Sequence, residues 1–179
     1  LSGASFNSTA ATAAMSAAST ATPIADVSNA VMRLNANGIF RGIHLVMEAS
    51  LYQEMLQTDD MRNLINGSGT FAWATDQVAR VLGVDEVVIC NTRYNSAAKG
   101  QSMTTSKIWP TTSYYVASLA NGPFSSGGIG RTLAYNARGG QFVSETYRTE
   151  QPPASVVRVR NCVDEIIINA NAGEKVTGA

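Results

Sequence analysis

The sequence has few charges, and neither sign is in excess. Charged residues make up 15% of the 179 residues, below the roughly 25% of an average globular domain, and 13 basic residues balance 13 acidic ones. Proteins that bind nucleic acid through phosphate contacts normally show a basic excess or patch, so this balance argues against that class. A surface with so little charge fits either a protein covered by partners or a small neutral globular protein.

Histidine and cysteine are also scarce, which limits the chemistry. The single histidine, His44, lies in an apolar run where a structural role is expected, and there is no second histidine for a two-histidine metal site. Cys90 and Cys162 each lie in an apolar, strand-like run, which predicts two buried thiols rather than a disulfide framework. We therefore expect no catalytic residues, no metal and no cofactor.

Long apolar runs are absent as well. No run approaches the roughly 20 residues needed to cross a bilayer, so no membrane partner is expected. Residues 1–21 are rich in Ala, Ser and Thr, but they lack the basic and apolar regions of a signal peptide. They are interpreted as an extended or loosely ordered arm or linker.

What is present in the first half is an alternation of helical and strand patterns. Thr22 followed by Pro23 is a typical helix start, Gly38 a helix end, and Ser50 with Gln53 resembles a capping box. The expected order is helix 22–38, strand 42–47, a second helix from Ser50, a polar loop after a short helical turn at 59–69, helix 71–82 ended by Gly83, and strand 84–90. This order predicts a small layered unit with helices on a short central sheet.

The second half is dominated by strand patterns. Residues 91–107 form a long polar segment, which in compact domains is usually functional or held by partners. Strands are expected at 114–119, as part of the first sheet, and at 131–135 and 141–148. Residues 156–178 are rich in β-branched residues and predict two strands joined near Asn161, or one bent strand.

A series of short motifs resembles a known family. The motifs are Leu45-Val46-Met47 followed by Tyr52 and Leu56, the strand pattern 81–89, the loop YNSAAKGQ at 94–101, Ile108-Trp109, and the closing segment from Val157. Together, and in this order over residues 22–179, they resemble the second half of tailed-bacteriophage major capsid proteins. No single motif is specific to this family, whereas the series of motifs in this order is.

The resemblance implies a fold and a division into domains. The fold class would be α+β, the Hong Kong 97-type capsid fold, with an A domain of helices on a short central sheet plus the β-rich part of the P domain. Residues 22–120 would form the A domain, residues 121–179 the P-domain strands with their connecting loops, and residues 93–105 a loop facing a capsomer axis.

The resemblance also implies a structural, non-catalytic function. The chain would be a major capsid protein subunit that self-assembles, as hexamers and pentamers, into the icosahedral shell enclosing a double-stranded DNA genome. It would be made in the host cytoplasm and reside in the virion. Further partners would be decoration, scaffolding or portal proteins, and packaged DNA through weak non-specific contact. Candidate inter-subunit contacts are the charged residues Arg93, Lys99, Arg138, Glu145, Arg158 and Asp164, although a solvated surface position is the alternative for each.

One feature departs from the family, and two other functions stay open. Family members carry an N-terminal arm, an extended E-loop and a long spine helix before the matched part, so we expect this chain to be a fragment or one part of a split shell protein. It should then fold without closing shells alone, and the sheet of its closing strands should be incomplete. The alternatives are the shell protein of an encapsulin-type nanocompartment and a small hydrolase that depends on His44.

Overall fold

A mixed five-stranded sheet forms the centre of the molecule. The computed structural model describes residues 7–68, 74–119, 128–134, 142–161 and 163–179. The strand order is β1-β11-β6-β2-β3, in which β1 pairs with β11, and β2 with β3, in parallel, while the other neighbours are antiparallel. These strands are β1 (Asn7–Ala10), β2 (Ile43–Glu48), β3 (Glu86–Cys90), β6 (Ser113–Ser118) and β11 (Gly173–Thr177).

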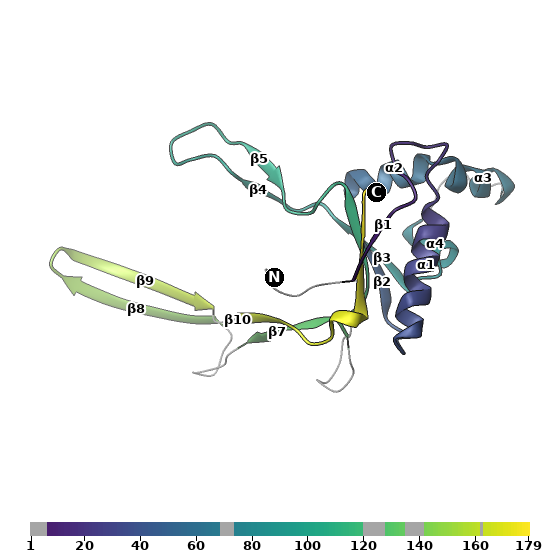
Figure 1. Cartoon of the computed structure of the whole chain (residues 1–179). Helices are drawn as coiled ribbons and strands as arrows, with labels where there is room; N and C mark the ends of the chain where they lie inside the picture. Colours follow the sequence, from purple (N-terminus) through teal and green to yellow (C-terminus); the bar gives the residue numbers. More distant parts are fainter. Residues whose placement is uncertain (1–6, 69–73, 120–127, 135–141, 162) are drawn as a thin grey trace.

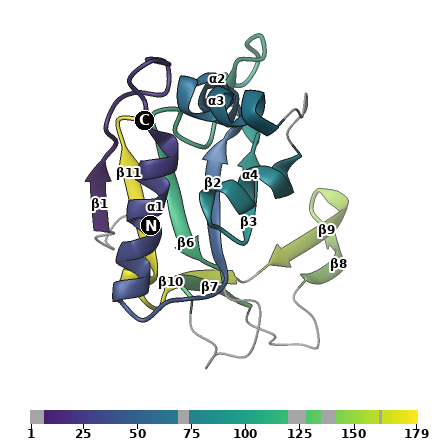
Figure 2. The same cartoon turned by 90° about the vertical axis from the view of Figure 1, so that its right-hand side faces the viewer.

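Four helices lie on one side of this sheet, with α3 packed on α1 and α2 rather than on the strands (Figure 2). They are α1 (Pro23–Ala36), α2 (Ala49–Gln57), α3 (Asp59–Ser68) and α4 (Thr75–Leu82). Alternate residues of the strands point to this face, so Leu45 and Met47 of β2 and Tyr114 and Val116 of β6 are fully buried beneath the helices. The predicted layer of helices on a short central sheet is confirmed.

The helix ends differ in part from the sequence-based expectations. The predicted left-handed glycine at the end of α4 is confirmed, because Gly83 has φ 71°. Thr22 makes no side-chain capping bond to α1. The proposed capping box at Ser50 and Gln53 was wrong, since Glu48 caps α2 and accepts from the Ser50 backbone N–H. A carboxylate at the end of a strand can serve as the cap of the next helix, and the two elements then join without a loop.

Residues 59–69 were expected to be a polar loop after a short helical turn, and the loop was wrong for residues 59–68. They form α3, whose first turn carries two aspartates where the helix dipole favours negative charge. Met61 is fully buried and fixes the helix to the core. The polar composition and the glycines at 67 and 69 suggested a loop, whereas packing of Met61 against the core favours the helix despite its low propensity.

The closing stretch holds three strands rather than two. β9 (Pro153–Asn161) pairs only with β8 (Phe142–Glu150), and β10 (Val163–Ile167) only with β7 (Gly130–Ala134), among the residues described. Their sheets are two-stranded, as the expectation of an incomplete sheet predicted. It was wrong for β11, which has neighbours on both sides in the central sheet and follows a short 3-10 helix at Ala170–Ala172.

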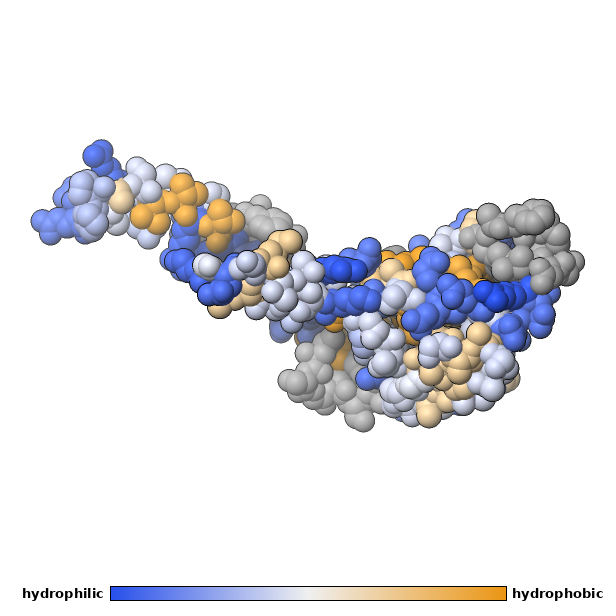
Figure 3. Space-filling view, turned by 90° about the horizontal axis from the view of Figure 1, so that it is seen from above, coloured by the Kyte–Doolittle hydropathy of each residue, from blue (hydrophilic) through white to orange (hydrophobic). Residues whose placement is uncertain are grey.

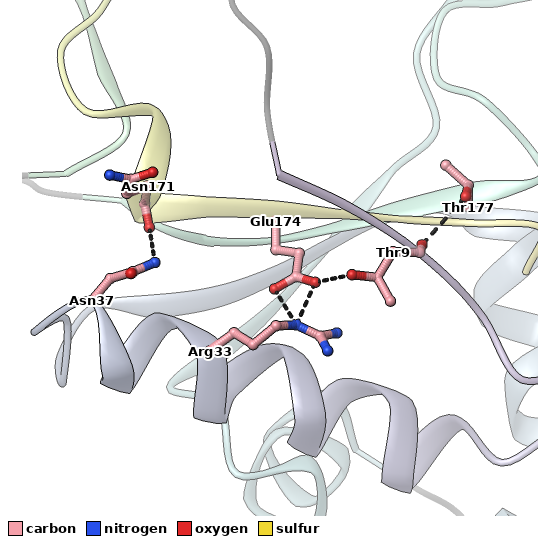
Figure 4. A network of polar contacts seen from close by, with 6 residues as sticks. All are labelled: Thr9, Arg33, Asn37, Asn171, Glu174 and Thr177. Atoms are coloured by element: carbon pink, nitrogen blue, oxygen red, sulfur yellow. Dashed lines mark hydrogen bonds and ion pairs between the residues drawn. The ribbon is translucent and has the colours of Figure 1, made fainter.

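The segment expected to be an arm is bound to the core over residues 7–21. β1 lies at the sheet edge, Met15 and Ala21 are buried, and the Thr12 hydroxyl donates to the Asp26 carboxylate on α1 at 2.6 Å. A second buried carboxylate, Glu174 of β11, holds the other end (Figure 4). It accepts from the Thr9 hydroxyl at 2.5 Å and from Arg33 Nε at 2.9 Å.

Two hairpins project from the side of the sheet that the helices leave uncovered (Figure 1). One is the long β8–β9 hairpin, which is connected to the body through β7 and β10. The other is formed by β4 (Arg93–Asn95) and β5 (Thr105–Lys107). The fold is therefore a packed body with two arms, and the division into A and P domains stays a prediction.

Candidate subunit interface

The β8–β9 hairpin exposes apolar side chains that no described residue covers. Val157 and Val159 are 64% and 65% exposed, and Tyr147 is 49% exposed. Figure 3 shows apolar surface along the arm that reaches furthest from the body, in contrast to the hydrophilic surface around its tip. An isolated two-stranded ribbon is only marginally stable in water, so this arm is of the kind that gains stability from a partner.

The pairing register separates this hairpin into two unlike faces. Residues that pair across two strands point to the same side. Thr146 pairs with Val157 and Ser144 with Val159, which makes one face uncharged in its middle. The opposite face contains Glu145 opposite Arg158.

An ion pair holds the charged face of the hairpin. Arg160 Nη2 lies 2.8 Å from Glu145 Oε2 on the neighbouring strand. The pair satisfies the carboxylate on that side. The valine-bearing face is uncharged in its middle and carries Arg148 and Glu150 only towards the hairpin turn. The middle of the valine-bearing face is thus the better candidate for burial against another molecule, because it can be desolvated at little cost.

The β4–β5 hairpin is short and is anchored at its base. Lys107 Nζ lies 3.0 Å from Glu48 Oε1 and donates to the Ser50 hydroxyl at 2.8 Å. Glu48 is only 3% exposed. Burial alone would raise the pKa of Glu48, but hydrogen bonds from Ser50 and Lys107 outweigh it and lower the pKa to about 2. The ion pair therefore remains charged at neutral pH and joins β5 to the start of α2.

The far part of this hairpin has its own polar scaffold. The Asn95 side-chain oxygen accepts from the backbone N–H groups of Ala97 and Thr104, each at 3.1 Å, and Ser96 N–H donates to the Thr104 carbonyl at 2.8 Å. These bonds span the nine residues between β4 and β5. The long polar segment predicted at 91–107 is therefore an ordered hairpin.

The predicted contact residues do not form a single site. Arg93 lies on β4 and Lys99 beyond it, both exposed, while Glu145 and Arg158 lie on the β8–β9 hairpin. Asp164 is exposed on β10 opposite Leu133, and Arg138 lies outside the described residues. The structure thus brings together Glu145 and Arg158 alone.

Sequence reasoning missed several side chains that matter in this arrangement. Arg160, rather than Arg158, forms the ion pair with Glu145, and Lys107 forms the one with Glu48. Val157 and Val159 were recognised as strand residues but not as exposed ones. Their alternation with arginine was the available signal, since it places the valines on one face and the charges on the other.

The positions considered for catalysis have structural contacts. His44 Nδ1 lies 2.6 Å from the Gly42 carbonyl oxygen, and Nε2 lies 3.6 Å from Glu86 Oε2. Cys90 is a free, half-buried thiol whose pKa is raised by burial, and Cys162 lies outside the described residues. Within the described ranges, no cluster of three His, Cys, Asp or Glu side chains could hold a metal ion, and no helix is long and apolar enough to cross a membrane.

Comparison with solved structures decides what this arrangement resembles. A phage-related protein from Bordetella bronchiseptica RB50 matches with a TM-score of 0.69 at 15% identity, over 88% of this chain and 51% of that one. A capsid protein of an Escherichia coli CFT073 prophage, described as putative, matches at 0.56 and 11%, over 90% and 48%. The capsid of cyanophage P-SCSP1u matches at 0.56 and 15%, over 97% and 53%. The chain has a phage capsid-like fold.

The other comparisons add no relative to this picture. No family model matches the sequence, and no curated protein matches it. The chain spans about half the length of the solved phage chains that share its fold.

Proposed function

We propose that this chain forms part of a tailed-phage major capsid protein that self-assembles into an icosahedral shell around double-stranded DNA. The single observation that carries the proposal is the β8–β9 hairpin with its uncovered Val157 and Val159 face, projecting from a phage capsid-like fold. A monomer would gain nothing from presenting this face to water. In a shell, a neighbouring copy would cover this face. Obligate interfaces bury roughly 2,000 Å² or more, which is large enough to include a projecting hairpin.

The Hong Kong 97-type arrangement is our assignment of the parts. In it, the central sheet with α1–α4 is the A domain, and β7 to β10 belong to the P domain. Residues 121–179 were predicted as P-domain strands, but β11 lies in the central sheet between β1 and β6, so in this assignment the end of the chain would return to the A domain. The A domains would gather in hexamers and pentamers, and contact with packaged DNA would be weak and non-specific.

The predicted contact residues divide between the two arms in this proposal. Arg93 and Lys99 would meet a neighbour near a capsomer axis, whereas Glu145, Arg158 and Asp164 would meet one at the periphery. Arg138 is proposed on sequence alone. Decoration, scaffolding and portal proteins stay candidates without a contact assigned to them.

The other functions are less well supported. The solved neighbours do not favour the shell of an encapsulin-type nanocompartment. A hydrolase dependent on His44 would require that side chain to be available, whereas it contacts Gly42 and Glu86. The capsid-like neighbours support a structural role in the virion.

Electron microscopy of particles from the native source tests the proposal. We expect icosahedral particles in whose density this fold repeats once per subunit, with the β8–β9 hairpin in contact with an adjacent copy. Recovery of the native protein only as a monomer, or only in particles of another composition, would refute a capsid role. The isolated 179-residue chain is a separate case, for which we predict folding without closed shells.

A further inference from the structure

The charges of this neutral chain are unevenly distributed along it. Residues 48–86 contain seven acidic and two basic residues, whereas residues 87–144 contain five basic and no acidic ones. The first range covers α2, α3, α4 and the start of β3, and the second includes the β4–β5 hairpin. The zero net charge thus conceals an acidic region and a basic one of equal and opposite charge.

The basic hairpin carries cations without partners. Lys107 is paired with Glu48 at the base, but neither Arg93 nor Lys99 makes an ion pair or a side-chain hydrogen bond within the described parts of the chain. Beside them, Tyr94 is 52% and Met103 74% exposed. Arginine, tyrosine and methionine are enriched at protein interfaces, so the hairpin has the composition of a docking element.

The hairpin is also held in a fixed direction. The ion pair between buried Glu48 and half-buried Lys107 fixes its base, and the two bonds accepted by Asn95 fix the chain beyond β4. A hairpin ordered before it meets a partner loses little entropy on binding. Its cations are therefore presented at a constant position on every copy.

The complementary surface lies at the junction of α2 and α3. Glu54 and Asp59 are exposed, and Asp60 is half-exposed; within the ranges described, none of the three side chains has a partner. Asp59 and Asp60 lie in the first turn of α3, where their negative charge stabilises the helix dipole without any partner. Glu54 lies near the end of α2, where a negative charge gives no such stabilisation. In Figure 1, α3 and the β4–β5 hairpin lie on opposite sides of the central sheet.

We propose that the β4–β5 hairpin of one copy docks on the α2–α3 junction of a second copy, with Arg93 and Lys99 facing Glu54, Asp59 and Asp60. The inference rests on the proposed shell function. Because the two surfaces differ and lie on opposite sides of the molecule, the contact is head-to-tail, and such contacts close into rings when the rotation between copies allows it. A second copy is the favoured occupant over DNA because the matching negative charge is on the chain itself.

Charge reversal on each side, and then on both, tests the contact. The association of the 179-residue chain is measured by sedimentation velocity over a range of concentration and salt. Arg93→Glu with Lys99→Glu should lower the association constant about tenfold or more, as should Glu54→Lys with Asp60→Lys, because like charges then face each other. Mixing the two double variants should restore association between them. Arg41→Glu, an exposed reversal on the turn before β2, should leave association unchanged.

Each remaining result decides against the contact. If the mixture of the two double variants stays unassociated, the two surfaces do not meet. If Arg93→Glu with Lys99→Glu associates normally but loses binding to a 30-base-pair DNA duplex, the occupant is DNA. A wild-type chain that stays monomeric at every concentration overturns this contact alone, since native particles decide the capsid function separately. Circular dichroism of each variant confirms that it is folded.

Discussion

The central sheet and the β8–β9 hairpin are built from similar β-branched strands but differ in what covers them. Leu45 and Met47 of β2 are fully buried beneath the helices, whereas Val157 and Val159 of β9 are more than half exposed. β2 is an almost continuous apolar run that is buried along most of its length, whereas β9 alternates valine with arginine, a pattern that marks one apolar face. The difference indicates that alternation specifies a face to be buried without specifying whether the same chain supplies the cover.

The largest expected effect is on the sheet side of this comparison. Leu45→Ala should lower the free energy of unfolding by about 2–5 kcal/mol, because it leaves a cavity in a packed core. Val159→Ala removes side-chain atoms of an exposed residue and should change it by less than about 0.5 kcal/mol. Urea unfolding of the two variants against wild type measures both. Equal losses would mean that the hairpin valine is covered within the monomer.

The sequence predicts most helices and strands better than the contacts between them, for a physical reason. Strands β2, β3 and β6 and helix α1 were correctly predicted, since their apolar periodicity reports burial within the chain. The site was predicted poorly. Arg158 and Arg160 are equivalent in the sequence, and only the register shows that Arg160 reaches Glu145 diagonally. Likewise, Lys107 and Glu48 are 59 residues apart, and only the fold brings them together.

The junction between body and hairpin should be the next most sensitive part. A Cβ on Gly130 of β7 would lie 2.6 Å from the backbone oxygen of Ile166 on β10, so Gly130→Ala must push the two strands apart. We expect a loss of about 1–3 kcal/mol. Gly173→Ala is the matched control, because its Cβ would meet the flexible end of Ile129, which can move aside at lower cost. Thermal unfolding of both variants measures the two losses of stability. A larger loss for Gly173→Ala than for Gly130→Ala would contradict the prediction.

A smaller effect is expected at the base of the other hairpin, and it depends on pH. The pKa of Glu48 is lowered from its ordinary value of 4.5 to about 2 in the folded chain. Its carboxylate therefore stabilises the fold above pH 4.5, and this contribution is lost as the pH falls from 4.5 towards 2. Glu48→Gln should cost about 1–2 kcal/mol at pH 7 by leaving Lys107 unpaired.

Unfolding followed from pH 6 down to pH 2 separates this effect from general acid denaturation. The wild-type stability should fall more steeply than that of Glu48→Gln, so the two curves should converge at the acid end. Glu54→Gln serves as the control, because the Glu54 side chain is exposed and makes no ion pair or hydrogen bond among the described residues. Parallel curves for wild type and Glu48→Gln would show that the Glu48–Lys107 ion pair is not formed in solution.

The smallest effect on the monomer should accompany a clear effect on assembly. Val157→Thr with Val159→Thr preserves β-branched shape while replacing two exposed methyl groups with hydroxyls, so the stability of the monomer should change by less than about 0.5 kcal/mol. If a neighbouring copy covers this face, the same hydroxyls become buried in the interface and weaken association. Val156→Thr, on the opposite face of β9, is the matched control. Sedimentation should then show weaker association for the double variant alone, whereas equal weakening by Val156→Thr would place the interface on the charged face instead.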